Sequence, residues 1–458
     1  MLSRREFLDI LTGIGGLAAM ADCSSPSGRD RQAADPPNVV VIVADDTGWA
    51  DVGYHGSEIR TPVLDRLVSR GIELNRFYSD PVCSPTRAAL LTGKPPSRFG
   101  IITPLRPDNP NHISPETTTI ADVFTRAGYD TALIGKWHLG MKRELLPDRY
   151  GFRYTYGYYG PWIDQYAHIT IDDTPDWHRN GVQISVSGHA TDLLTDESVR
   201  FITTERDATK PFFLLLTYSV PHLPMQEEER WLKPYRETID NDSRRYFAAS
   251  MTHMDDAIGR CIAALDEAGI ARDTLVLFFS DNGGATPGFR SWVPESGFFN
   301  GTRDMDDLGR NIPLRDYKAS VYEGGIRVPA CAYWPGTLKP GVSDCTVTVR
   351  DLFSTLAVAA GIELPSDAAP EGVNCWDAIV DRSVEPERIL YWRLPRQLAV
   401  RKGQWKLVHR GRTPSEGKNE LFNVFDDPFE TTDCSALHPE TVSELSQELQ
   451  RQFAMDPS

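Results

Sequence analysis

The sequence has no cluster of basic residues and no long apolar segment. Its 64 acidic residues outnumber the 48 lysines and arginines, which gives a formal net charge of −16 at pH 7. Nucleic acid is therefore excluded as a partner, since its binding requires a concentrated positive surface. The apolar run near the N-terminus is too short to cross a bilayer, so we expect no stable membrane span.

Cysteine is scarce and follows no metal-binding pattern. The seven cysteines form no Cys-x-x-Cys pair, so a thiolate zinc site has no support. Internal repeats and low-complexity segments are also absent, which leaves an ordinary globular chain. Its 458 residues suffice for a large core and two domains. Because the net charge repels anions, an anionic substrate would require a strongly positive local pocket.

The N-terminal segment has the features of an export signal. Arg4 and Arg5 precede a short apolar run and a small-residue cleavage site, an arrangement that resembles a bacterial twin-arginine signal. We predict a signal peptide over residues 1–21, a polar linker over residues 22–36, and a periplasmic or secreted protein. A lipid-anchored form attached at Cys23 is the alternative, although an acidic residue stands before Cys23 where a small one is expected.

Several continuous apolar runs indicate buried strands. These runs occupy residues 38–46, 131–135, 212–219 and 274–282. Runs of this kind are typical of strands that are covered on both faces. Helical patterns lie between them, at residues 191–204 and 247–269. The alternation predicts an α/β fold in which a large, mainly parallel, mixed β-sheet is sandwiched by helices, and we assign this domain to residues 37–380.

The predicted secondary structure changes after residue 361. Short strand-like pieces, separated by turn residues, are followed by a polar helical pattern over residues 440–453. This pattern predicts a smaller C-terminal subdomain over residues 381–458, built from an antiparallel sheet and one helix.

Polar residues follow each of the predicted strands. They are Asp45 and Asp46, Lys136 and His138, His222, and Asp281 and Asn282. Ligands bind beyond the carboxyl ends of parallel strands, so we expect these side chains to meet at one edge of the sheet.

Four of these residues form a candidate metal site. Asp45, Asp46, Asp281 and Asn282 offer only oxygen ligands, which suit a hard cation such as calcium or magnesium and do not suit zinc or copper. Without a cation, the clustered carboxylates would repel one another. The alternative is that both motifs are ordinary strand-to-loop turns.

The segment "DPVCSPTRAALLTG", residues 80–93, places Cys83 at the start of a predicted helix. A cysteine at this position is either a thiolate nucleophile, favoured by the helix N-terminus, or a small apolar plug. Arg87 lies one helical turn further on and faces the same end of the helix. Together with Lys136 and Lys318, it would supply the positive field that the chain otherwise lacks.

The segment from Cys83 to Gly93 resembles the signature of the type I sulfatases, in the alkaline phosphatase superfamily. The stretches "VADDTGW", "GKWHLG", "PHLP", "SDNGG", "YKASVYEGGIRVP" and "ELFNVFDDPFETTD" follow the order found in that family. The resemblance covers roughly residues 37–435 and is strongest to the arylsulfatase and N-acetylgalactosamine-sulfatase branch. It implies an alkaline-phosphatase-like fold and a sulfuric ester hydrolase.

The resemblance also implies a modified nucleophile and a bound cation. Cys83 would be oxidised to Cα-formylglycine by a maturation enzyme that reads Thr86 and Arg87. The metal ligands would be Asp45, Asp46, Asp281, Asn282 and the modified Cys83. Calcium is the expected ion and magnesium the alternative.

In the mechanism that the resemblance implies, a hydroxyl of the hydrated aldehyde attacks sulfur. The sulfate would be held by the metal and by Arg87, Lys136, His222 and Lys318. Lys318 or His222 would protonate the leaving alcohol, and His138 would deprotonate the second hydroxyl to expel sulfate.

An aromatic segment, residues 156–193, is the predicted substrate side. Trp162, Trp177 and His178 resemble a platform for a sugar ring, and aromatic packing inside a long insertion is the alternative. Residues 291–311 read as a further loop near the metal motif. We therefore expect a sulfated saccharide or an aryl sulfate as substrate.

Two other functions are compatible with these residues. A phosphonate or phosphate monoester hydrolase of the same superfamily would share the metal and the nucleophile. A non-catalytic protein that binds sulfated glycans would keep the fold but would have no use for the aldehyde. Outside the motifs, His253 lies in an amphipathic helical pattern, for which a structural role is expected.

Overall fold

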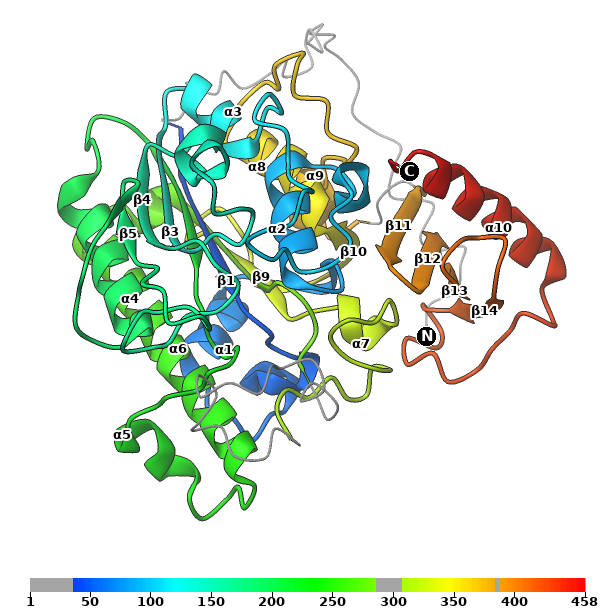
Figure 1. Ribbon diagram of the computed structural model, residues 1–458, viewed down its shortest axis with the longest axis horizontal. Helices are drawn as coiled ribbons and strands as arrows, with labels where there is room; N and C mark the ends of the chain where they lie inside the picture. The colour runs from blue at the N-terminus through cyan, green and yellow to red at the C-terminus, as the bar shows by residue number, and fades with distance from the viewer. Residues whose placement is uncertain (1–35, 286–306, 384–386, 458) are drawn as a thin grey trace, which may run out of the picture. The chain divides into compact units, whose positions relative to one another are not determined.

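The central element of the computed structural model is a ten-stranded mixed β-sheet (Figure 1). Its strand order is β10-β2-β9-β8-β1-β7-β3-β4-β5-β6. β1 pairs in parallel with both β7 and β8, whereas β9 runs antiparallel between β2 and β8. The predicted α/β class with a large, mainly parallel, mixed sheet is confirmed.

The strands of this sheet include the four that the sequence predicted. Their bounds are β1 Asn38–Ala44, β2 Ile72–Tyr78, β3 Asp130–Lys136, β4 Tyr154–Tyr158, β5 His178–Arg179, β6 Val182–Gln183, β7 Phe212–Thr217, β8 Thr274–Ser280, β9 Ala330–Tyr333 and β10 Gly341–Thr348. The helices are α1 Pro62–Arg70, α2 Cys83–Thr92, α3 Ile120–Arg126, α4 Ala190–Arg200, α5 Glu229–Leu232, α6 Asp242–Glu267, α7 Glu323–Ile326, α8 Leu352–Ala359, α9 Trp376–Asp381 and α10 Pro439–Ala454.

The two faces of β1 explain its continuous apolar sequence. Val40 and Ile42 belong to a core shared with α1, α4 and α6. Val39 and Val41 belong to a second core shared with α2, α3 and α8. Successive strand residues point to opposite faces, so a strand covered by helices on both sides must be apolar at every position.

A second sheet follows at the C-terminus. It is antiparallel in the order β11-β12-β13-β14, with bounds Ile389–Leu394, Gln397–Lys402, Trp405–Arg410 and Lys418–Asn423. One face packs on α10, and the other packs on residues beside β2 and α7. The predicted antiparallel subdomain with one helix is confirmed, whereas its predicted start at residue 381 stays a prediction.

The structure describes residues 36–285, 307–383 and 387–457. The predicted signal peptide over residues 1–21, nearly all of the linker and most of the loop over residues 291–311 lie outside them. Residues from Pro36 onward form one compact unit. No helix in these described ranges combines the length and the apolarity that crossing a membrane requires.

Candidate active site

The polar residues predicted to meet lie together beyond the carboxyl ends of four neighbouring strands. These strands stand in the order β8-β1-β7-β3. Asp45 and Asp46 follow β1, Lys136 ends β3, His222 follows β7, and Asp281 and Asn282 follow β8. Parallel neighbours end at the same edge, which is why short motifs far apart in sequence converge here.

The acidic residues are in direct contact. The Asp46 backbone N–H donates to Asp281 Oδ1 at 3.2 Å, and Asn282 Nδ2 donates to Asp46 Oδ1 at 2.8 Å. Asp46 adopts a φ of 75°, a left-handed conformation that turns the chain sharply after Asp45. The side chains of all four residues are buried.

Three cations balance these carboxylates. Lys136 Nζ lies 2.6 Å from Asp45 Oδ2, Lys318 Nζ lies 2.6 Å from Asp46 Oδ1, and Arg87 Nη2 lies 3.1 Å from Asp281 Oδ2. Burial favours the neutral acid, yet Lys136 holds the pKa of Asp45 below its ordinary value. Burial and the neighbouring Asp45 carboxylate raise the pKa of Asp281 to about 7.

The donor set fits a hard divalent cation. Within the described part of the chain, Asp45 Oδ1 and Asn282 Oδ1 are buried oxygens without a hydrogen-bond partner. Buried oxygens are normally satisfied, so such orphans indicate a missing partner. Carboxylate and amide oxygens are the ligands that calcium and magnesium prefer.

Cys83 begins helix α2 and is 2% exposed. Burial raises the pKa of the Cys83 thiol, although Lys136 and Lys318 partly oppose this. The thiolate interpretation, based on the helix N-terminus, is therefore not supported.

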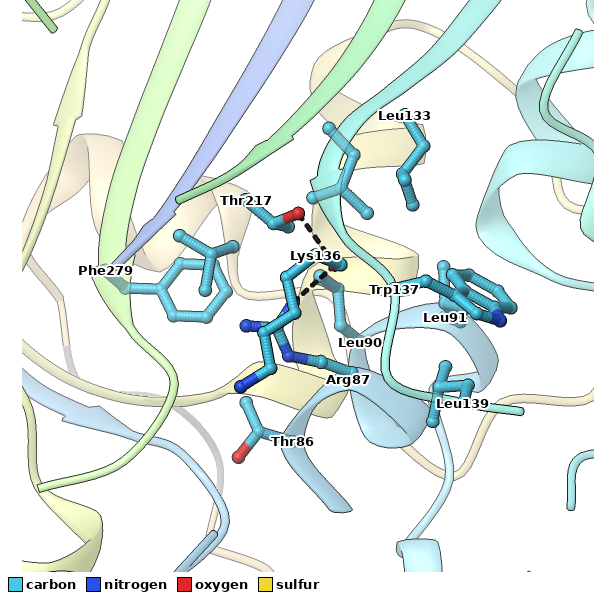
Figure 2. Close-up of a pocket in the computed structure, with 12 residues that line it drawn as sticks. Thr86, Arg87, Leu90, Leu91, Leu133, Lys136, Trp137, Leu139, Thr217 and Phe279 are labelled. Carbon is cyan, nitrogen blue, oxygen red and sulfur yellow. Dashed lines mark hydrogen bonds between the residues drawn. The ribbon is translucent and has the colours of Figure 1, made fainter. Parts of the chain in front are cut away.

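Arg87 projects from α2 beneath the site. Its Nη1 donates to the Lys136 carbonyl oxygen at 2.7 Å, which also accepts a hydrogen bond from Thr217 (Figure 2). Thr86 Oγ1 donates to the Asp281 carbonyl oxygen at 2.6 Å. The cavity that Arg87 lines, about 10 Å³, is scarcely the size of one water molecule. Tight packing therefore fixes the guanidinium.

His138 is held as a neutral base. Its Nε2 donates to the Leu105 carbonyl oxygen at 3.0 Å, which leaves the lone pair on Nδ1. In the described structure, Nδ1 is buried and has no hydrogen-bond partner. Burial, Lys136 and Arg87 lower the pKa of His138 well below its usual value. Because Nδ1 is buried, the ring can accept a proton there only from a group in direct contact with it.

His222 faces the carboxylates. Its Nδ1 donates to the Leu223 carbonyl oxygen at 2.8 Å, and its Nε2 lies 3.7 Å from Asp46 Oδ2. Burial and the nearby Lys318 ammonium lower the pKa of His222 to about 4. Lys318 itself remains cationic, because Asp46 raises the pKa of its ammonium above the ordinary value despite burial.

Part of the site opens into a pocket of about 670 Å³. Cys83, His138, His222 and Lys318 all line it. The volume is in the range of small-molecule sites, about 300–1,000 Å³, and admits a sugar ring. Trp162 also lines the pocket, as predicted, and its ring centroid lies 6.4 Å from that of His222.

Two predicted substrate-binding residues do not belong to this pocket. Trp177 is 1% exposed, and its indole packs against Tyr156 and Tyr158 in the core, so it offers no face to a sugar. His178 does not line the pocket either, because its ring stacks on Tyr159. The contacts of both residues favour the packing alternative.

Sequence reasoning missed other residues of the pocket wall, namely Arg106, Asp316, Tyr317 and Gln397. Gln397 comes from the C-terminal sheet, and its Oε1 accepts the Val321 N–H at 3.1 Å. Tyr317 begins the motif "YKASVYEGGIRVP", but no motif separates Arg106, Asp316 or Gln397 from ordinary loop residues. For Asp316 the available signal was its closeness to Lys318 in sequence.

A second buried cluster consists of His189, Glu227 and His253. His253 Nδ1 lies 2.8 Å from Glu227 Oε2, and its Nε2 lies 3.4 Å from Asp192 Oδ1. Burial opposes protonation, but both carboxylates together raise the pKa of His253 to about 9. His189 Nδ1 accepts the Thr191 N–H at the start of α4. The structural role that the sequence predicted for His253 stays a prediction.

Comparison with known proteins decides the family. A family model described as Sulfatase matches residues 37–362. The chain belongs to the sulfatase family. It is therefore a sulfuric ester hydrolase, and the predicted resemblance is confirmed.

Individual relatives match over most of the sulfatase chain. Arylsulfatase J of Mus musculus is 30% identical over 497 residues, covering 95% of this chain and 78% of the relative. N-acetylgalactosamine-6-sulfatase of Mus musculus is 31% identical over 431 residues, covering 88% and 75%. The crystal structure of Ps i-CgsB in complex with k-i-k-neocarrahexaose matches with a TM-score of 0.82 and 27% identity, covering 92% of this chain and 94% of that chain.

Proposed function

We propose that this sulfatase hydrolyses a sulfate monoester on a saccharide. The observation that carries the proposal is the meeting of Cys83, His138, His222 and Lys318 at the base of one sugar-sized pocket. Two similar proteins support a saccharide substrate by name: an N-acetylgalactosamine-6-sulfatase and Ps i-CgsB, which was crystallised with k-i-k-neocarrahexaose.

We further propose that Cys83 is matured to Cα-formylglycine. The hydrated aldehyde supplies a hydroxyl nucleophile and a second hydroxyl through which sulfate is expelled. The raised pKa of the thiol supports this proposal, because an unmodified Cys83 is a poor nucleophile here. Maturation requires a formylglycine-generating enzyme as a partner.

Asp45, Asp46, Asp281 and Asn282 are proposed to hold calcium, with magnesium as the alternative. The cation supplies Lewis-acid polarisation of the sulfate and of the nucleophile. The two orphaned oxygens in this cluster support the assignment.

The remaining residues bind the ester and move protons. Arg87, Lys136 and Lys318, held in place by ion pairs to the acidic cluster, would bind the sulfate oxygens. Lys318, which stays cationic, donates a proton to the leaving alcohol oxygen. His222, the alternative donor, would first have to gain a proton at Nε2, because its pKa is lowered to about 4 and its Nδ1–H is committed to Leu223. His138 accepts a proton at Nδ1, because its other ring nitrogen is committed to Leu105.

Export is proposed from the sequence alone. The twin-arginine-type segment over residues 1–21 would carry a folded protein to the periplasm or beyond the cell.

The decisive experiment joins mass spectrometry with product analysis. The tryptic peptide FYSDPVCSPTR, residues 77–87, is measured in protein from a host that has the maturation enzyme. We expect a peptide lighter by the exchange of thiol for aldehyde, together with sulfate release from 4-nitrophenyl sulfate and from sulfated saccharides. Cys83→Ala should abolish release, whereas Cys434→Ser, a cysteine that does not line the pocket, should not.

Three results would contradict the proposal. An unmodified Cys83 without sulfate release favours a glycan-binding protein. Faster hydrolysis of phosphate than of sulfate monoesters favours the phosphohydrolase alternative. Activity on the aryl ester with none on any saccharide removes the sugar substrate.

A further inference from the structure

Arg106 differs from the cations that surround the acidic cluster. Arg87, Lys136 and Lys318 are buried, and each is paired with a carboxylate of the acidic cluster. Arg106 is exposed and lines the pocket wall. Among the described residues, its guanidinium has no ion-pair or hydrogen-bond partner. An arginine side chain offers five N–H donors in a planar fork, a geometry that suits carboxylate and sulfate groups.

The backbone beside Arg106 is tied to the reaction centre. The Leu105 N–H donates to Ser84 Oγ at 2.9 Å, and the Leu105 carbonyl accepts from His138 Nε2 at 3.0 Å. Ser84 Oγ in turn donates to the His138 carbonyl oxygen at 3.0 Å. Arg106 therefore projects from a segment that is held against both Cys83's helix and the proposed base. Its distance from the scissile group is restricted accordingly.

The wall also contains a carboxylate, from Asp316. Asp316 Oδ2 accepts a hydrogen bond from Ser320 Oγ at 2.7 Å. Its remaining oxygen can accept a sugar hydroxyl but would repel an anion. Arg106 is thus the place on the described wall where a second negative group would be stabilised.

We propose that Arg106 binds a second anionic substituent, a carboxylate or a further sulfate, on the saccharide that carries the scissile sulfate. The substrate class is then a polyanionic saccharide such as a uronate-containing or multiply sulfated one. This inference rests on the proposed function. It means that the second anionic group of the substrate is bound by a residue other than those that bind the scissile sulfate.

The test uses matched disaccharides that differ only in the second charge. One member of each pair carries a sulfated N-acetylhexosamine next to glucuronic acid, and the other carries the same sulfated sugar next to galactose. The pairs cover each sulfate position in turn. The measured quantity is the ratio of kcat/KM for the charged member to kcat/KM for the neutral member, because a general loss of active protein cancels in this ratio.

We expect wild type to prefer the charged member and Arg106→Ala to lower the ratio about tenfold, the effect of one charge-assisted contact at an exposed site. Arg106→Lys should retain part of the preference, since lysine keeps the charge but loses the fork. The preference should weaken with added salt. Arg149→Ala is the matched control, an exposed arginine outside the pocket, and should leave the ratio unchanged.

The outcomes separate this inference from the proposed function. If wild type releases sulfate equally from both members, or if Arg106→Ala leaves the ratio unchanged, the inference is wrong although the sulfatase assignment stands. Release from 4-nitrophenyl sulfate without release from any disaccharide also overturns it. If no sulfate ester of any kind is cleaved by protein carrying the aldehyde, the proposed function itself has failed.

Discussion

Replacement of Lys406 by methionine should destabilise the protein severely. Lys406 lies on β13 in the C-terminal sheet, and its Nζ is 2.9 Å from Glu323 Oε1 and 2.9 Å from Glu430 Oε1. All three side chains are fully buried. The Glu323 N–H also donates to Glu430 Oε2 at 2.6 Å. The triad therefore joins the C-terminal sheet to α7, which follows the Lys318 loop.

The expected loss of stability can be estimated from these distances. Two unit charges 2.9 Å apart attract by about 6 kcal/mol at an effective dielectric constant of 20, and desolvation offsets much of this attraction. Removing the cation of the triad leaves Glu430 without its ion-pair partner and leaves Glu323 only Arg327, whose Nη1 lies 3.9 Å from Glu323 Oε2. Loss of one partner from a buried pair costs about 3–5 kcal/mol, and we expect a value in this range for Lys406→Met.

Urea unfolding followed by tryptophan fluorescence measures the loss. Burial and Glu323 already raise the pKa of Glu430 to about 7 in the presence of Lys406. Without Lys406 the buried carboxylates take up protons more readily, so the loss of unfolding free energy in the variant should grow as pH rises.

The double variant Lys406→Met with Glu430→Gln should recover part of the lost unfolding free energy. Lys402→Met, which removes an exposed pair with Glu444, should cost less than about 1 kcal/mol. A loss for Lys406→Met no larger than that of Lys402→Met would refute the reasoning.

Further predictions concern the aromatic residues, the metal and a buried histidine. Trp162→Ala should raise KM for saccharides with little loss of stability, whereas Trp177→Ala should cost about 3–5 kcal/mol by urea unfolding. Chelation should lower the melting temperature as well as sulfate release, because the acidic cluster loses its cation, and calcium should restore both better than magnesium. Since the pKa of His253 is raised to about 9, its protonation stabilises the fold fully below about pH 6.5, and this contribution is lost as pH rises through about 9. The stability gap between wild type and His253→Gln should shrink over that window, and a gap that is independent of pH would exclude the imidazolium.

Much of the site was predictable because its residues are fixed by strand ends. Asp45 and Asp281 follow β1 and β8, whose apolar runs are unmistakable in sequence. Once these strands are parallel neighbours, their carboxyl ends must coincide. The meeting of these residues at one edge of the sheet could therefore be predicted from the apolar runs and from the rule for parallel strands.

The pocket wall follows no such rule. Gln397 reaches the pocket only because the C-terminal sheet packs beside α7, a tertiary contact without a local signal. Trp177 shows the opposite limit: an aromatic residue in a polar segment reads as a sugar platform, and only the enclosing Tyr156 and Tyr158 reveal a core position. Burial on a long insertion depends on how the insertion folds back, which periodicity does not report.

The charge balance of the site explains how so acidic a protein can bind an anionic ester. The three carboxylates of the cluster are matched by three cations, while burial and neighbouring cations keep His138 and His222 neutral near pH 7. The side chains of the site alone therefore contribute little net charge there. A divalent cation among the carboxylates would make the base of the pocket positive by about two charges, within a surface that is negative overall. Binding of the ester would then depend on the cation.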